Sequence, residues 1–126
     1  MNKKYTIDNI RPYFIGEYEI KGETEDKYFT NLQPVLEANP DSLVFIDHHR
    51  PDRQKFVDRT EAGMIICDRG IEYYKEIHGS KTLIMVEHPR LLFMRIGNNL
   101  FKKNHVKFFD THGSIHAYYK TNGAPA

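Results

Sequence analysis

The sequence has one cysteine, no long hydrophobic run and almost no net charge, and each shortage excludes a class of protein. The lone Cys67 cannot form an internal disulfide, which fits a reducing compartment. No apolar run approaches the roughly 20 residues of a membrane span, and the first residues lack a signal-peptide core. A net charge of +1 gives no strong attraction to nucleic acid or to anionic membranes. We therefore expect a cytoplasmic protein that neither binds nucleic acid nor spans a membrane.

What the sequence does contain is typical of one globular α/β domain. Its 126 residues are 40% hydrophobic and 28% charged, and a chain of this length can bury about two thirds of its unfolded surface. Apolar segments alternate with helical patterns, which indicates right-handed βαβ units and a small, mainly parallel sheet. The expected strands are 18–22, 43–46, 63–68 and 82–86. The expected helices are 51–59, 71–77 and 88–101, the last with Leu92, Ile96 and Leu100 on one face.

The last twenty residues differ from the rest of the chain. After a short apolar piece at Val106–Phe109, the sequence is rich in small and polar residues and has no helical period. We therefore assign residues 1–105 to the α/β domain and residues 106–126 to a linker, a tail or the start of a further element. Three histidines at and after residue 105 have no shared face, so solvent exposure is expected rather than a zinc site. They are His105, His112 and His116.

The most informative segment is the end of the second expected strand. Leu43–Ile46 is followed at once by Asp47, His48, His49 and Arg50. In α/β sheets, ligands bind beyond the carboxyl ends of the strands, so these polar side chains are expected at the mouth of a site. Their chemistry suits either a metal ion or a polar ligand with a flat ring.

Five short blocks occur in a recognisable order, namely 20–22 (IKG), 43–46 (LVFI), 61–66 (EAGMII), 82–93 (TLIMVEHPRLLF) and 113–117 (GSIHA). The first four resemble segments of the N-terminal domain of UDP-acylglucosamine N-acyltransferase, a hexapeptide-repeat acyltransferase of lipid A synthesis. The fifth looks like that family's transition into a left-handed β-helix, usually Ile-His-Pro-Thr-Ala. The resemblance covers roughly residues 15–118.

The resemblance implies a binding domain rather than a catalytic one. In that family the N-terminal domain helps to bind the uridine of a UDP-amino sugar, whereas a trimeric β-helix carries the catalytic histidine and the acyl-carrier-protein site. No series of β-helix rungs occurs in this sequence, and no nucleophile is paired with an oriented base. The expected partner is therefore a UDP-sugar, with no cofactor and no catalytic residue assigned. A homotrimer and an acyl-carrier-protein contact are expected only of a parent protein that has the β-helix.

Phe45 is the residue that the resemblance points to first. The aromatic at the matching strand position of the family forms one wall of the uracil pocket, and stacking a base on an aromatic ring contributes about 1–3 kcal/mol. From the residues alone, a Phe inside an apolar strand is a core residue. Both interpretations are open at this point.

The loop after this strand departs from the family. An Asn-Pro-Lys-Tyr-like loop, whose Asn reaches the sugar and whose Tyr forms the second uracil wall, is replaced by residues 48–53 (HHRPDR). His48 is the candidate replacement for the Asn, and no Tyr lies nearby. Arg50 or Arg53 either stacks on the base, pairs with the diphosphate or lies in solvent. The candidate binding residues are thus Phe45, Asp47, His48, His49, Arg50 and Arg53.

Two other classes of protein compete with a UDP-sugar domain. The letters Asp47-His48-His49 resemble the motif of the DHH phosphoesterases, which use two metal ions. The earlier motif of that family does not occur in residues 1–46, and Asp68 is the one obvious further ligand, so no metal is assigned. The second class is a protein-interaction module that keeps the fold without the ligand, which the missing Tyr supports. Cys67, His78 and His88 have structural explanations as a core thiol and two helix-end residues.

Overall fold

The computed structural model describes residues 3–101. The expected tail at 106–126, with the 113–117 block, lies outside the described residues, and so do His105, His112 and His116. The chain divides into two units between Arg95 and Ile96, within the last helix. The sheet and every candidate residue belong to the first unit, Met1–Arg95.

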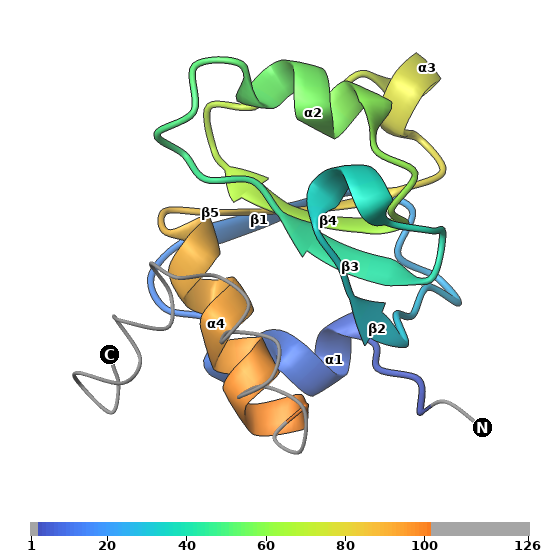
Figure 1. Cartoon of the computed structure of the whole chain (residues 1–126), viewed down its shortest axis with the longest axis vertical. Coiled ribbons are helices and arrows are strands. Elements are labelled where there is room, and N and C mark those ends of the chain that lie inside the picture. Colours follow the sequence, from blue (N-terminus) through green and yellow to red (C-terminus); the bar gives the residue numbers. More distant parts are fainter. Residues whose placement is uncertain (1–2, 102–126) are drawn as a thin grey trace. The chain divides into compact units, whose positions relative to one another are not determined.

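Five strands of the described part form one sheet in the order β1-β5-β4-β3-β2 (Figure 1). They are β1 Tyr18–Gly22, β2 Asn31–Leu32, β3 Ser42–Phe45, β4 Met64–Asp68 and β5 Thr82–Val86. Strands β2 to β5 pair in parallel, and β1 pairs antiparallel with β5. The α/β fold with a mainly parallel sheet is therefore confirmed, and the four expected strands form within one residue of their expected bounds.

Helices cover both faces of this sheet. They are α1 Ile7–Ile10, α2 Arg53–Arg59, α3 Lys75–His78 and α4 Pro89–Leu100. In Figure 1, α2 and α3 lie on one face of the sheet, while α1 and the first turns of α4 lie on the other. None of the helices in the described part is long and apolar enough to cross a membrane.

Two expected helices are shorter than their sequence patterns indicate. Helix α2 begins at Arg53 because the preceding Pro51 and Asp52 form a turn. Helix α3 begins at Lys75 instead of Ile71, because backbone N–H groups of the segment before Lys75 form hydrogen bonds outside the helix. The N–H of Ile71 donates to the carbonyl of Asp68, and the N–H of Glu72 donates to Gln54 on α2.

The polar stretch 23–41 contains structure that its composition does not reveal. Strand β2 and a 3₁₀ turn at Val35–Glu37 both form there. Phe29 is fully buried and its backbone pairs with that of Tyr5. A single buried aromatic in a polar run has no periodic neighbours, so the pattern gives no signal for it.

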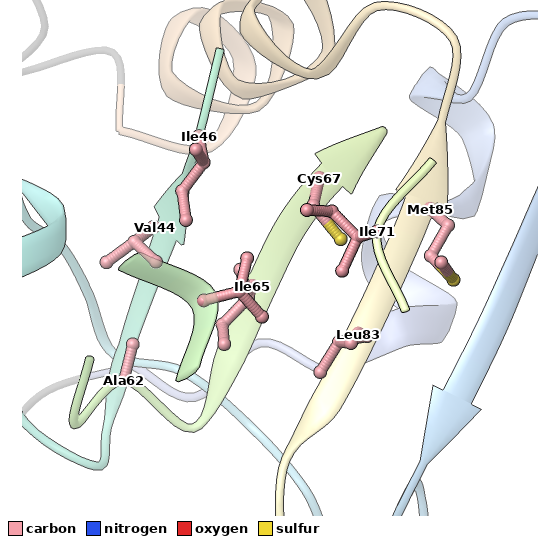
Figure 2. Close-up of a cluster of buried hydrophobic side chains, with 9 residues drawn as sticks. Val44, Ile46, Ala62, Ile65, Cys67, Ile71, Leu83 and Met85 are labelled. Atoms are coloured by element: carbon pink, nitrogen blue, oxygen red, sulfur yellow. The ribbon is translucent and has the colours of Figure 1, made fainter. Parts of the chain in front are cut away.

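The core explains why the central strands are apolar at every position. Successive side chains of a strand point to opposite faces, and both faces of this sheet are covered, so no polar alternation is required. The cluster in Figure 2 lies on the face toward α2, and its buried members include Val44, Ile46, Ile65, Cys67, Leu83 and Met85. The expected burial of the Cys67 thiol is confirmed. Phe45, between Val44 and Ile46, points to the opposite face.

Two buried details fix how the segments meet. A Cβ at Gly63 would lie 2.3 Å from the carbonyl oxygen of Pro40, so this close approach requires glycine just before β4. His78 is fully buried, accepts a hydrogen bond from the Tyr74 N–H at Nδ1 (2.9 Å) and lies 2.7 Å from Asp58 through Nε2. Because Nδ1 is the acceptor, the ring proton is on Nε2 and points to Asp58. His78 therefore joins α3 to α2.

Candidate functional site

The carboxyl ends of β3, β4 and β5 lie at one edge of the sheet because these strands are parallel. Phe45 is paired in register with Ile66, and Asp68 with Val86. The loops that follow the three strands therefore leave from the same edge. The expected polar strand tip lies there, where ligands bind in open α/β sheets.

Phe45 ends β3 and is partly buried. Its ring centroid lies 4.8 Å from that of Phe93 on α4, with an angle of 38° between the ring planes. Phe93 is itself buried, so it holds the Phe45 ring against the sheet. Phe45 therefore packs partly into the core and is partly exposed to solvent.

Asp47 organises the loop after β3. Its Oδ1 accepts the N–H of His49 at 3.0 Å, and its carbonyl accepts the N–H of Arg50 at 3.1 Å, which closes a tight turn. Partial burial raises the pKa of Asp47, but the hydrogen bond from the His49 backbone and the electrostatic effects of His49, His48 and Arg90 outweigh burial and lower the pKa below its ordinary value. Asp47 is therefore a carboxylate at neutral pH.

Three histidines cluster at this edge. The ring of His48 lies 3.9 Å from that of His49 and 5.8 Å from that of His88, measured between centroids. The Nδ1 atoms of His48 and His49 lie 3.5 and 3.3 Å from Asp47 Oδ1. Sequence reasoning treated His88 as a helix-start residue and missed this proximity. The signal was present, because His88 follows β5 and the ends of parallel strands meet.

Arg50 is directed toward α2. Its guanidinium carbon lies 4.2 Å from the centroid of the Phe56 ring, and its Nε lies 3.3 Å from Asp52 Oδ1. One face of the Arg50 guanidinium is therefore covered by Phe56. An exposed ion pair of this kind is weak, so the Asp52 contact leaves Arg50 able to exchange partners.

Arg53 forms the shortest ion pair of the candidate residues. Its Nε lies 2.6 Å from Asp68 Oδ1, and its Nη1 donates to the carbonyl of Arg50 at 3.2 Å. The second oxygen of Asp68 accepts the N–H of Gly70 at 2.9 Å. The hydrogen bond and charge of Asp68 raise the pKa of Arg53. Arg53 thus positions the loop after β3. Asp68, which the sequence suggested as a further metal ligand, is paired with Arg53.

A comparison with known families matches the part of this fold from just before β2 to near the end of α4. Residues 28–98, more than half of the chain, match the model of the family UDP-3-O-(3-hydroxymyristoyl) glucosamine N-acyltransferase, LpxD. The matched range contains the blocks 43–46, 61–66 and 82–93, whereas 20–22 and 113–117 lie outside it. No curated protein matches the chain. The N-acyltransferase family of lipid A synthesis that the sequence resembles is thereby confirmed, and the chain belongs to the UDP-3-O-(3-hydroxymyristoyl) glucosamine N-acyltransferase family.

Proposed function

We propose that this domain recognises the UDP-amino sugar of an N-acyltransferase in lipid A or surface-glycan synthesis, with Phe45 stacked on the uracil. The observation that supports the proposal most directly is the partly accessible Phe45 ring at the carboxyl end of β3, braced by Phe93. The family to which the chain belongs supplies the ligand class, since the description of that family contains a UDP-glucosamine. A ring held in place by packing loses little freedom on binding, which favours stacking.

Polar groups for the rest of the ligand come from the loop after β3. Asp47 offers a carboxylate to sugar hydroxyls, and His48 takes the place of the family's Asn. The family's Tyr has no counterpart in this loop, and the 80% exposed side chain of His49 provides a flat ring in its place. Arg50 reaches the diphosphate by exchanging its contact with Asp52. Arg53 contributes to binding indirectly, because its ion pair with Asp68 holds the loop after β3 in place.

Catalysis is assigned to a different part of the family's architecture. We place the acyl transfer, the acyl-carrier-protein contact and the trimer interface on the family's β-helix rather than on residues 3–101. The domain itself would therefore bind the nucleotide-sugar without turning it over. The proposed compartment is the cytoplasm.

A titration of the full chain with UDP-N-acetylglucosamine, followed by amide NMR shifts, tests the proposal. We expect the shifts to concentrate in 45–53 and at His88, and UDP alone to reproduce most of them. Phe45→Leu should weaken binding about 5- to 150-fold, the equivalent of about 1–3 kcal/mol of stacking. Leu keeps the apolar contact with Phe93, so the variant should fold. Tyr74→Leu, which removes an exposed aromatic ring of the α3 segment, is the matched control and should bind normally.

The outcome also separates the competing classes. Binding that is unchanged in Phe45→Leu would exclude the stacking role, because the ring would then be a core residue only. A failure of UDP-N-acetylglucosamine, UDP and uridine to shift any resonance would favour the protein-interaction module. Cleavage of a phosphodiester by the chain with manganese would favour the DHH-type phosphoesterase fragment.

A further inference from the structure

Asp47, His48 and His49 bring three ligand atoms of a kind that metals prefer into one small space. One carboxylate oxygen and one nitrogen of each imidazole all lie within 4.8 Å of one another. Sequence reasoning assigned no metal because a two-metal centre needs ligands from other strands. That argument does not apply to a single ion, for which two imidazoles and one carboxylate are sufficient.

The two separations from Asp47 Oδ1 fit a shared ion better than they fit hydrogen bonds. The Nδ1 atoms of His48 and His49 lie 3.5 and 3.3 Å from Asp47 Oδ1, whereas a charge-assisted N–H···O bond measures about 2.7–2.9 Å. Two ligand atoms bound tetrahedrally to one Zn²⁺ at about 2.0–2.2 Å lie roughly 3.3–3.6 Å apart. The observed distances fall in or close to this range.

A second observation points to a missing ligand. The Nδ1 atom of His48 is buried and has no hydrogen-bond partner. Buried polar atoms are nearly always bonded, since an unsatisfied one has lost its water without replacement. A cation beside Asp47 Oδ1 would satisfy this nitrogen. His49 can adjust to complete the set, because its side chain is 80% exposed.

We propose that Asp47, His48 and His49 form a mononuclear site for a divalent transition-metal ion, with Zn²⁺ as the best match. Two imidazoles and one carboxylate leave a coordination position open, as in catalytic zinc sites and in the facial triad of non-haem iron. The three ligands also belong to the proposed nucleotide site, but the test contains no nucleotide, so the metal site is tested independently of UDP-sugar binding.

Calorimetric titration of the full chain with zinc chloride tests the site. Asp47→Asn, His48→Gln and His49→Gln should each weaken Zn²⁺ binding by at least about tenfold, since removing even an outer partner of a metal ligand costs about 10–100-fold. Asp47→Asn keeps an oxygen acceptor for the His49 N–H, and His49 is exposed, so both variants should fold; circular dichroism checks this. Zn²⁺ should also shift the imidazole ¹⁵N resonances of His48 and His49.

His112→Gln is the matched control, because it removes an imidazole outside the described residues. Zinc affinity that falls in His112→Gln but not in His49→Gln would overturn the proposal by placing the ion elsewhere. The proposal would also be overturned if zinc chloride gave no heat of binding, or if all three site variants bound Zn²⁺ with the affinity of the unchanged chain.

Discussion

Arg53 Nε lies 2.6 Å from Asp68 Oδ1, which ties the first turn of α2 to the end of β4. The adjacent Gly70 makes this possible, because a Cβ there would lie 2.8 Å from Asp68 Oδ2 and 3.0 Å from Arg53 Nη2. The pair spans fifteen positions of the sequence. It holds the loop after β3 and the loop after β4 at the same edge of the sheet.

Asp68→Asn should lower the melting temperature, because Arg53 would lose a charge-assisted bond that is only partly exposed to water. Thermal unfolding followed by circular dichroism measures the change. Arg69→Gln is the matched control, since it removes an exposed pair with Glu17 and should have a smaller effect. Equal effects of the two substitutions would show that the Arg53–Asp68 pair has no special role.

Asp47→Asn should destabilise the fold at neutral pH, and the difference from the unchanged chain should disappear in acid. The pKa of Asp47 is lowered in the folded state, so its stabilising contribution is complete above the unfolded value of about 3.9. It is lost as the pH falls through the lowered folded value. Melting curves between pH 7 and pH 2 measure this, and a difference that grows in acid would have the wrong sign.

His78→Leu should lower the free energy of unfolding by about 1–3 kcal/mol. The N–H of Tyr74 and the carboxylate of Asp58 would each lose their hydrogen bond to the buried His78 ring. Urea unfolding measures the loss. His88→Leu, at an exposed histidine, should change stability by less than about 0.5 kcal/mol. If both variants unfold at the same urea concentration, His78 does not join α3 to α2 as described.

Cys67 should resist thiol reagents until the protein unfolds. Burial, with a smaller effect of the charge of Asp68, raises the pKa of its thiol to about 12, and the thiolate is the reactive form. A colorimetric disulfide reagent should therefore react slowly in buffer and quickly in urea. The assay is unambiguous because the chain has one cysteine. Rapid labelling of the native protein would contradict the burial of this strand.

The strands and the polar edge of the sheet were predictable for a definite reason. Leu43–Ile46 and Thr82–Val86 are continuous apolar runs, and a strand covered on both faces needs no polar alternation. The polar tip after Leu43–Ile46 follows from the rule that parallel strands end together. Helix α3 was predicted too long because Glu72 bonds to Gln54, a contact that no local pattern encodes.

The amino-acid sequence was sufficient for the α/β class, the mainly parallel sheet and the acyltransferase family, because burial patterns and ordered blocks are local properties of the chain. Contacts between distant segments came from the packed fold. Packing placed Phe93 behind Phe45, engaged Arg53 with Asp68, and brought His88 next to His48. These contacts depend on how the helices pack against the sheet. In a closely packed interior, small differences in side-chain volume and charge determine which side chains become neighbours.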